Sequence, residues 1–371
     1  MKILMASLDF PPNPRGGEGL MAIQVARGLC ERGFDVEVIA PLKPGSEKFD
    51  ADEPFAVHRV KTFGSTFLTT VPSFYWAARK FIREFNGDLI YSLRPVPTRK
   101  DLPHVHHFHT LRRGEAYGCW KTGAYLSAGL NLLYAPLDSH MVKAANAVVV
   151  LTSQMAKVIK NTVDVDNKCT VIGNGIDPAN FPPNISRLFD TMKLLYVGRL
   201  DARKGLPDLL NAFRLLSNRH PALQLTIVGD GPIANKINRD ILRLNLGDRV
   251  TCTTPVDQKK LVEFYHQHDL LVVPSIYEAF GLVVLEGMST GIPVLSSDQC
   301  AAIGQIMYPA GDVRALTARI EQLVSSDEKR RLLSTAGYEA AVEWTSEKMA
   351  DSVATLFHTV TSDFRASRQT Q

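Results

Sequence analysis

Residues 1–40 read MKILMASLDFPPNPRGGEGLMAIQVARGLCERGFDVEVIA, and three patterns follow one another in them. The apolar run Lys2–Leu8 ends before a proline-rich turn, which is typical of a buried strand. Apolar residues then recur every three or four positions from Met21 to Leu29, which predicts a helix, and Val36–Ala40 reads as a second strand. Strand, helix and strand in so short a segment form a βαβ unit, and this unit requires a parallel sheet.

The same alternation of strands and helices extends through both halves of the chain. Further strands are predicted at 89–92, 147–151, 194–197, 223–228, 270–273 and 293–296, and a further helix at 205–216. Between the halves, residues 176–191 contain three prolines and show no periodicity, as expected of a linker. We therefore expect an α/β protein of two Rossmann-like, doubly wound domains, residues 1–175 and 176–345. The interdomain cleft at the carboxyl ends of the strands is where α/β proteins bind ligands.

The bulk composition indicates a soluble globular protein of more than one domain. At 371 residues the chain is too long for a single core, and its 45% hydrophobic and 22% charged residues are ordinary. No apolar run approaches the roughly 20 residues that span a bilayer, and the first run stops at Asp9 without a signal-peptide cleavage site. The five cysteines form no close pair that would indicate a metal site or a redox dithiol, so we expect a cytoplasmic protein.

The net charge of +4 comes from an excess of Lys and Arg in residues 1–175. This excess fits an anionic partner of the first domain, either a lipid surface or a phosphorylated acceptor, and it fits a solvated surface equally well. No nucleic-acid partner is expected. The segment Phe74–Phe85 carries aromatic and basic residues at helical spacing. It is either a core helix with a solvated basic edge, which is the commoner case, or a helix that lies on an anionic membrane.

A glycine-rich loop, Arg15–Gly19, precedes the first predicted helix. Gly17–Ala22 matches the dinucleotide pattern G-x-G-x-x-A, which would suggest a dehydrogenase. However, Asp9–Arg15 separates the glycines from the strand, and the second strand ends without the acidic residue that would hold a ribose. Gly16 and Gly17 are therefore interpreted either as a tight turn or as a place where amides at a helix N-terminus approach a phosphate.

Two glutamates, Glu278 and Glu286, flank an apolar segment, and the whole reads EAFGLVVLE. This segment resembles the signature of the family-4 retaining glycosyltransferases (glycosyl transferases group 1), which have the GT-B fold. Other segments agree with that family in order and spacing: the loop 10–17, the segments 150–153 and 173–177, the loop 197–205 and the loop 228–232. Because several segments agree in register over most of the chain, the resemblance is specific although each segment alone is weak.

The resemblance implies a binding site for a nucleotide-sugar donor. It assigns Arg199 and Lys204 to the diphosphate, whose negative charge grows as the glycosidic bond breaks. Two solvated charges on a surface loop are the alternative. Amides near Phe280–Leu282, at a helix start, would face the phosphates. The remaining candidate donor contacts are the glycines Gly16, Gly17, Gly229 and Gly281.

The two glutamates of the signature would hold the sugar parts of the donor. Glu286 suits a ribose diol, because a carboxylate can accept two hydroxyl hydrogen bonds. Glu278 would reach hydroxyls of the transferred sugar. Glutamates on a helix surface are the alternative, and the apolar run between these two argues against it.

Four histidines alternate within residues 104–109. The spacing of His106 and His109 would allow zinc, but no cysteine or carboxylate nearby completes a ligand set. The resemblance places one histidine of this region beside the transferred sugar, at the end of a first-domain strand. His109 matches best by position and His107 is the second choice. A strand with outward, solvated histidines is the alternative.

Two further segments bear on the resemblance. Asp164–Asp166 form an Asp-x-Asp, the manganese signature of the other glycosyltransferase fold, but they follow a helix-like segment and two sheets are predicted, so no metal is expected. After Ser297 the chain reaches Gly311 sooner than the family does and lacks its glutamate, in a loop that the resemblance places beside the donor. The GT-B resemblance also implies that a helix at about 346–371 packs back on the first domain.

The resemblance implies a retaining glycosyltransferase that moves a hexose or N-acetylhexosamine unit in glycan, glycolipid or cell-envelope polysaccharide biosynthesis. The donor would be a UDP-, GDP- or ADP-sugar, the acceptor a carbohydrate or lipid-linked hydroxyl, and no cofactor is expected. We expect front-face attack, with His109 stabilising the developing cation. A nucleotide-sugar epimerase and a binding protein without turnover are the alternatives on the same architecture. Peripheral association with the inner face of a membrane would involve the basic first half.

Overall fold

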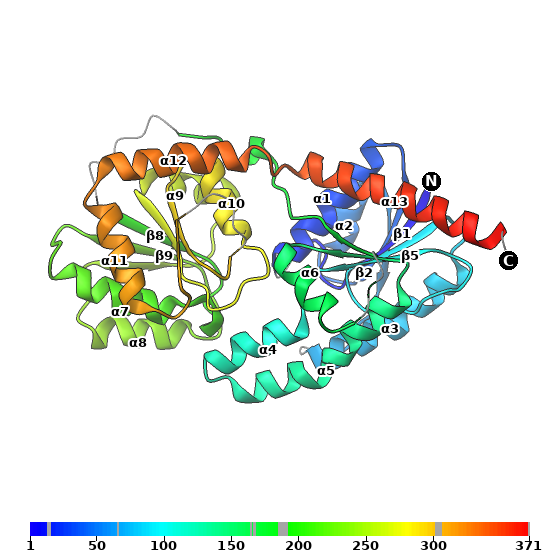
Figure 1. Ribbon diagram of the computed structural model, residues 1–371, viewed down its shortest axis with the longest axis horizontal. Helices are drawn as coiled ribbons and strands as arrows, with labels where there is room; N and C mark the ends of the chain where they lie inside the picture. Colours follow the sequence, from blue (N-terminus) through cyan, green and yellow to red (C-terminus); the bar gives the residue numbers. More distant parts are fainter. Residues whose placement is uncertain are drawn as a thin grey trace. The chain divides into compact units, whose positions relative to one another are not determined.

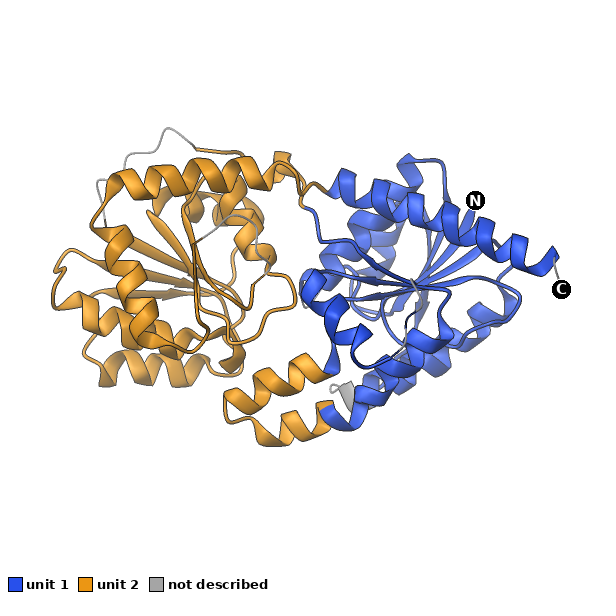
Figure 2. Cartoon of the chain, viewed as in Figure 1, with its two compact units in different colours: residues 1–112, 132–175, 346–371 blue, residues 113–131, 176–345 orange. Residues whose placement is uncertain are grey.

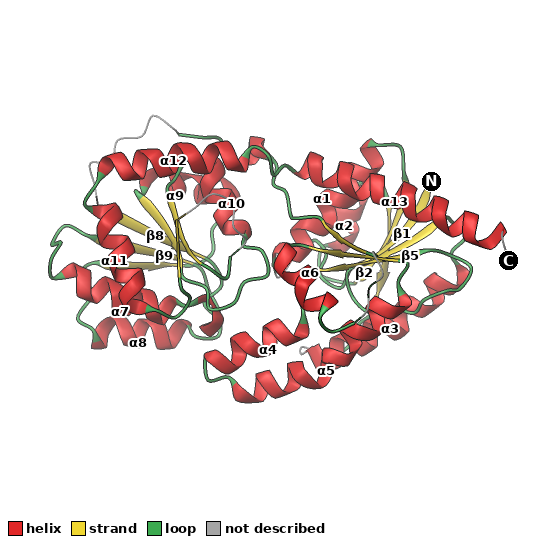
Figure 3. Ribbon diagram, in the orientation of Figure 1, coloured by secondary structure: helices red, strands yellow, loops and turns green. Residues whose placement is uncertain are grey.

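The computed structural model describes residues 1–12, 16–64, 67–163, 165, 168–184, 192–300 and 306–369 (Figure 1). The chain divides into two compact units (Figure 2). Unit 1 contains residues 1–112, 132–175 and 346–371, and unit 2 contains residues 113–131 and 176–345. Each unit has one parallel sheet with helices on its faces (Figure 3), so the expected α/β architecture of two doubly wound sheets is confirmed.

Residues 113–131 group with unit 2, although the sequence placed them in a first domain of residues 1–175. They form most of helix α4 (Arg112–Lys121) and the first turns of helix α5 (Tyr125–Ala144). Helix α4 lies close against Tyr277, because a Cβ on Gly118 would stand 2.7 Å from the Cβ of Tyr277. Such a close approach requires glycine, and hydrophobic periodicity gives no sign of it.

The described part of unit 1 forms a sheet of seven parallel strands in the order β3-β2-β1-β4-β5-β6-β7. Their bounds are β1 Lys2–Ala6, β2 Asp35–Pro41, β3 Ala56–Val60, β4 Leu89–Ser92, β5 His104–Phe108, β6 Ala147–Val150 and β7 Cys169–Val171. The predicted strands at the positions of β1, β2, β4 and β6 are confirmed to within two residues. Strands β3 and β7 were not predicted, because AVHRV and CTV are short and partly polar.

Helices α1 and α13 pack together in the core of unit 1. The helices that lie wholly in this unit are α1 Gly17–Glu31, α2 Ser46–Ala51, α3 Phe67–Glu84, α6 Ser153–Lys160 and α13 Ser346–Gln369, and residues 132–144 of α5 also belong to it. Helix α1 buries Met21 and Leu29, whose spacing predicted it. A Cβ on Gly28 would stand 2.6 Å from the Cβ of Ala350, so the two helices approach closely at this glycine.

The described part of unit 2 forms a sheet of six parallel strands in the order β10-β9-β8-β11-β12-β13. Their bounds are β8 Lys193–Val197, β9 Gln224–Val228, β10 Val250–Thr253, β11 Leu270–Val273, β12 Val294–Ser297 and β13 Ile306–Tyr308. The helices are α7 Leu206–Ser217, α8 Ala234–Arg243, α9 Gln258–Gln267, α10 Leu282–Ser289, α11 Val313–Val324 and α12 Asp327–Ala341, with short 3₁₀ helices η1 Pro178–Asn180 and η2 Ala202–Lys204. The predicted strands at β8, β9, β11 and β12 are confirmed to within one residue.

Helix α3 is a core helix on one face and basic on the other. It buries Phe74 and Ile82, whereas Trp76 is exposed with the Arg79 guanidinium 5.4 Å from its ring centre. The core-helix interpretation is therefore correct for its inner face. Within the described part of the chain, no helix combines the length and the apolarity that crossing a membrane requires.

Candidate functional site

Three loops of unit 2 leave the carboxyl ends of adjacent strands and carry most of the candidate residues. Residues 198–205 follow β8, residues 229–233 follow β9 and residues 274–281 follow β11. Strand β8 pairs in parallel with both β9 and β11, so the three loops emerge at the same edge of the sheet. This edge is where ligands bind in open α/β sheets.

Gly229 allows the first two of these loops to pack backbone against backbone. Its φ of +154° lies outside the range that other residues adopt readily, and a Cβ there would overlap the carbonyl oxygen of Gly198. The amide of Gly198 donates a 3.0 Å hydrogen bond to the carbonyl of Val228. Glycine at position 229 is therefore required for the shape of the edge, whatever it contacts in a ligand.

Lys204 and Glu278, predicted as separate candidates, form an ion pair in this structure. Their side chains are 29% and 17% exposed, so both remain within reach of solvent. The two loops are fixed to each other, because the Ile276 amide donates a 2.7 Å hydrogen bond to the Arg203 carbonyl. The backbone hydrogen bond between the loops thus keeps the Lys204 cation and the Glu278 carboxylate side by side.

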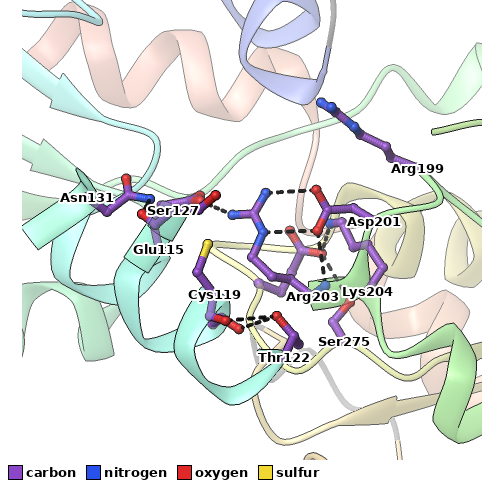
Figure 4. Close-up of polar contacts among 12 residues, drawn as sticks. Glu115, Cys119, Thr122, Ser127, Asn131, Arg199, Asp201, Arg203, Lys204 and Ser275 are labelled. Atoms are coloured by element: carbon purple, nitrogen blue, oxygen red, sulfur yellow. Dashed lines mark hydrogen bonds and ion pairs between the residues drawn. The ribbon is translucent and has the colours of Figure 1, made fainter. Parts of the chain in front are cut away.

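Arg203, which sequence reasoning missed, is held by two carboxylates. Figure 4 shows its guanidinium beside Asp201 and Glu115, with Arg199 directed away from them. Burial lowers the pKa of Arg203. Asp201 also accepts a 3.0 Å hydrogen bond from the Arg203 amide and caps η2. No local pattern could have revealed the pair with Glu115, because that residue lies far away in the sequence. Arg199 itself is exposed.

Helix α10 begins where the phosphate-facing amides were expected. Gly281 precedes it with a φ of +97°, and Leu282 is its first residue. The first amides of any α-helix have no acceptor within the helix, so they remain available to an anion. The Phe280 side chain is buried and its ring centre lies 5.6 Å from that of Trp344. The side chain of Phe280 therefore belongs to the packing of unit 2, and only its backbone could serve a ligand.

Glu286 lies half-buried on α10 beside Tyr265 of α9. The buried tyrosine hydroxyl donates a 2.8 Å hydrogen bond to Glu286 Oε2. Burial raises the pKa of Glu286, and the bond from Tyr265 opposes this rise without cancelling it. One tyrosine proton occupies only one of the acceptor positions of a carboxylate, so Glu286 retains capacity for further hydroxyl donors.

The histidines of β5 are buried and bond to β4. Ser92 Oγ lies 2.7 Å from both His104 Nε2 and His106 Nδ1, and the Tyr91 hydroxyl lies 2.6 Å from His107 Nδ1. Burial lowers the pKa of His104 to about 4 and that of His107 to about 3, so these imidazoles are neutral at physiological pH. The alternative of outward, solvated histidines is therefore wrong.

His109 follows the last residue of β5 and is 8% exposed. Its Nε2 is buried without a hydrogen-bond partner among the described residues. Burial, together with the charge of Arg94, lowers its pKa well below the usual value. His109 lines a cavity of about 20 Å³ with Arg94, Thr110 and Asp138, which is room for roughly one water molecule. In the described ranges, no three His, Cys, Asp or Glu side chains gather as a metal site would require.

Gly16 and Gly17 begin helix α1 in unit 1. Gly16 has extended backbone (φ −170°), and a Cβ there would meet nothing within 4 Å. Its amide donates a 3.1 Å hydrogen bond to Asp9 Oδ2. In the first turn of this helix, Glu18 forms a bidentate ion pair with Arg94, at 3.0 and 2.5 Å. Sequence reasoning missed this pair, whose members lie on different elements of the unit.

Two of the sequence features fall partly outside the described residues. These are Asp164 and Asp166 of the Asp-x-Asp and residues 301–305 of the loop that departs from the family. Of that loop the two ends are described: the Asp298 amide donates a 2.9 Å hydrogen bond to the Tyr308 carbonyl, and Gly311 turns with a φ of +80°. The loop therefore starts and ends at neighbouring points of strands β12 and β13.

Two family models match the chain, one after the other. "Glycosyltransferase Family 4" matches residues 15–180, and "Glycosyl transferases group 1" matches residues 184–340. The first match contains the glycine-rich loop and the histidines of unit 1, and the second contains the three loops and α10 of unit 2. Together the two matches include nearly every element described above.

Sequence relatives and similar solved structures support the family that the two models indicate. The glycogen synthase of Mycobacterium tuberculosis (strain CDC 1551 / Oshkosh) is 27% identical over 329 residues, which cover 80% of this chain and 78% of that one. The structure of sucrose-phosphate synthase (tll1590) from Thermosynechococcus elongatus has a TM-score of 0.79 at 21% identity, and the match covers 98% of this chain and 99% of that one. Anabaena Alr3699/HepE in complex with UDP and glucose has a TM-score of 0.74 at 17% identity, with 97% and 100% covered. The chain therefore belongs to the glycosyltransferases of family 4 and group 1 and has the GT-B fold.

Proposed function

We propose that the chain is a retaining glycosyltransferase that moves a hexose or N-acetylhexosamine unit from a nucleotide-sugar to a hydroxyl of a carbohydrate or lipid-linked acceptor. The arrangement around α10 carries this proposal. Glu278 lies before the helix, Glu286 lies within it, and the N-terminus of the helix at Leu282 lies between them. A nucleotide-sugar has the same order of groups, with a diphosphate between two sugars that present hydroxyls.

The diphosphate would be held by cations and by the start of α10. Arg199 is exposed, and Lys204 is paired with Glu278. A diphosphate would compete for Lys204 and so release Glu278 toward the sugar hydroxyls. As the leaving group gains charge, fixed cations and helix amides stabilise the transition state more than the ground state. These two cations supply the countercharge, so the proposal includes no metal cofactor.

The ribose of the donor would be held by Glu286. Tyr265 fixes one oxygen of this carboxylate at 2.8 Å and thereby sets the orientation of the other. A diol presents two donors at a fixed spacing, which suits a carboxylate that is held in one rotamer. Base recognition would fall to backbone groups around residues 249–255, which include strand β10.

The proposed reaction is front-face substitution at the anomeric carbon. The bond from this carbon to the diphosphate oxygen breaks, the acceptor oxygen bonds to the same face, and the departing phosphate takes the acceptor proton. His109 of unit 1 is assigned the stabilisation of positive charge on the sugar. Its lowered pKa keeps it uncharged, as a group beside a developing cation must be.

Thermal stability against a panel of nucleotide-sugars tests the donor site. UDP-sugars come first in the panel because the HepE neighbour was solved with UDP, followed by GDP- and ADP-sugars. A donor at 100 times its Kd adds about 2.7 kcal/mol to stability, which corresponds to a rise of roughly 5–10 °C for a unit of this size. Absence of any rise with all three nucleotide classes would contradict the proposal.

The products separate transfer from its alternatives. With the donor identified, an acceptor screen followed by NMR of the product should show the anomeric configuration of the donor. Donor alone that turns into an epimer would identify an epimerase instead. Donor binding without turnover on any acceptor would favour a binding protein. An inverted product would refute the retaining mechanism while leaving the donor site intact.

A further inference from the structure

Helix α4 contacts the two loops of unit 2 that carry Lys204 and Glu278. Arg203, the residue immediately before Lys204, forms an ion pair with Glu115 of α4. Tyr277, the residue immediately before Glu278, packs against the same helix. All five residues belong to unit 2. Each contact of α4 therefore lies one residue away from a member of the Lys204–Glu278 ion pair.

Tyr277 lies along two glycines of α4. A Cβ on Gly118 would stand 2.7 Å from the Cβ of Tyr277, and a Cβ on Gly114 would stand 2.3 Å from its hydroxyl oxygen. Residues four positions apart share one face of a helix and are about 6 Å apart along its axis. The tyrosine side chain therefore lies lengthwise in a groove that exists because neither position has a side chain.

The two glycines make α4 itself less stable. Glycine within a helix loses more backbone freedom on folding than alanine does, and it gives the helix no side chain to pack. Two glycines on one face are useful to a helix where another group must approach that face closely. In α4 that group is Tyr277, so the closeness of the loop to the helix accounts for both glycines.

Arg203 joins α4 to the loop after β8 through its side chain. Its Nε and Nη2 donate hydrogen bonds of 3.2 and 3.3 Å to the two oxygens of Asp201, and its Nη1 faces Glu115 (Figure 4). The side chains of Arg203 and Glu115 are 24% and 20% exposed. The guanidinium group is planar and presents its donors in a fixed geometry, so contacts on two sides restrict its orientation. The Arg203 carbonyl also accepts the bond from Ile276 described above, which includes the second loop.

We propose that Arg203 and Tyr277 are positioning residues, through which α4 holds Lys204 and Glu278 in the arrangement that binds the donor. This inference rests on the proposed function. A partly exposed ion pair is weak, and long charged side chains lose rotamer freedom when they bind a ligand. Fixing the backbone one residue away lowers that loss, because the side chains then start from fewer orientations. Loosening α4 should therefore weaken donor binding.

Calorimetric titration of the full chain with UDP, GDP and ADP tests the proposal. Glu115→Gln keeps the size of the side chain and removes the charge that faces Arg203, whereas Gly118→Ala places a methyl group against Tyr277. Each change should raise the Kd of the diphosphate that the parent binds by about five-fold. This is less than the roughly 10- to 150-fold rise expected when a charged hydrogen bond is removed altogether. Glu115→Asp keeps the charge and should lose less affinity than Glu115→Gln.

Two matched controls and a melting curve exclude general effects of the substitutions. Gly129→Ala changes a glycine of α5 that has nothing within 4 Å of its Cβ position. Glu321→Gln removes a carboxylate that pairs with Arg219 elsewhere in unit 2. Both controls should bind the diphosphate as the parent does. Because Glu115→Gln introduces no overlap, it keeps the test decisive even where Gly118→Ala melts at a much lower temperature.

The Lys204→Ala background distinguishes positioning from a general loosening of the unit. Substitutions that act through one another are not additive, whereas independent ones are. If α4 acts through Lys204, then Glu115→Gln should cost little further affinity for the diphosphate once the lysine is absent. Losses that multiply in the double variant would refute positioning through Lys204.

Hydrogen exchange without any ligand tests whether α4 fixes the second loop. Amides of residues 274–281 should lose protection in Glu115→Gln and in Gly118→Ala, because local opening becomes easier when packing is removed. Unchanged protection in both variants would show that α4 packs on the loop without fixing it, and would refute the proposal.

The outcomes of the titration separate this inference from the proposed function. No binding of UDP, GDP or ADP by the parent would refute the donor site and the positioning role together. Binding by the parent that neither Glu115→Gln nor Gly118→Ala weakens would refute the positioning role alone and leave the donor site intact.

Discussion

Replacing Glu286 by glutamine separates two effects of this carboxylate: the cost of its burial to folding stability and its contribution to donor binding. The substitution keeps the shape and still offers Tyr265 an acceptor oxygen. Burial raises the pKa of Glu286, so the carboxyl group of Glu286 binds a proton more tightly in the folded protein than in the unfolded chain. The protonated Glu286 side chain therefore contributes fully to the stability of the fold below the ordinary carboxyl pKa. This contribution is lost as the pH rises through the raised pKa of the folded protein. At neutral pH the charged group opposes folding, so the glutamine variant should melt at a higher temperature than the parent.

The same substitution should weaken donor binding. Hydrogen bonds to a charged acceptor contribute about 1.5–3 kcal/mol, and losing that much raises the Kd roughly 10- to 150-fold. For a loss of about 100-fold, a donor concentration of 100 times the parent Kd equals the Kd of the variant. The stabilisation by donor then falls from about 2.7 to about 0.4 kcal/mol. The donor-induced rise in melting temperature should nearly vanish.

Melting curves from pH 5 to pH 8, with and without the donor found in the panel, measure both effects. The control is Glu263→Gln, which changes an exposed carboxylate on the same helix as Tyr265 and should alter neither quantity. A Glu286 variant that melts higher but keeps the full donor response would show that this carboxylate is not a ribose contact. A variant that melts lower at neutral pH would refute the reasoning from burial.

Three further predictions concern single residues. Lys204→Ala should remove most of the donor-induced rise in melting temperature while lowering the melting temperature of the free protein little, because a partly exposed ion pair contributes about 1 kcal/mol or less. Gly229→Ala should lower the melting temperature through a loss of roughly 2–4 kcal/mol, since it combines a φ of +154° with backbone overlap, and Gly247→Ala, which has open space around its Cβ, is the control. His109→Ala should reduce transfer and spare the donor-induced shift; in the parent, activity should show no inflection near the ordinary histidine pKa, because the pKa of His109 is far lower.

The architecture could be predicted because buried parallel strands consist of apolar runs. The sequence of β4, LIYS, and that of β11, LLVV, reveal their burial directly, and helix α1 shows its inner face in the spacing of its apolar residues. Strand β3 contains a histidine and an arginine, His58 and Arg59, which bond to Glu37 and Asp50 respectively. The polar residues of this strand are paired with charged residues of the same unit. A prediction from hydrophobicity alone cannot detect such pairs.

The candidate site was predictable only where it is local in sequence. The turn at Gly281, the start of α10 and the position of Glu286 follow from one continuous segment. The partner of Glu286 comes from another element, at Tyr265, and the pair of Arg203 with Glu115 also joins two elements. Each such pair depends on the crossing of two elements in space, which a single sequence does not report. Sequence reasoning therefore finds candidate ligand contacts sooner than the residues that orient them.

The charges of the two signature glutamates are compensated by different partners, and this difference leads to a last prediction. Glu286 remains partly desolvated beside a tyrosine, whereas Glu278 is paired with Lys204, for which we propose that a diphosphate competes. If so, Glu278→Gln frees Lys204 in advance. The variant should bind the nucleoside diphosphate alone more tightly than the parent does. Its affinity for the nucleotide-sugar should fall relative to its affinity for that diphosphate, because the sugar hydroxyls lose a charged acceptor. Calorimetric titration with both ligands measures this ratio. A parallel loss of affinity for the two would mean that Glu278 holds the loop in place and does not contact the sugar.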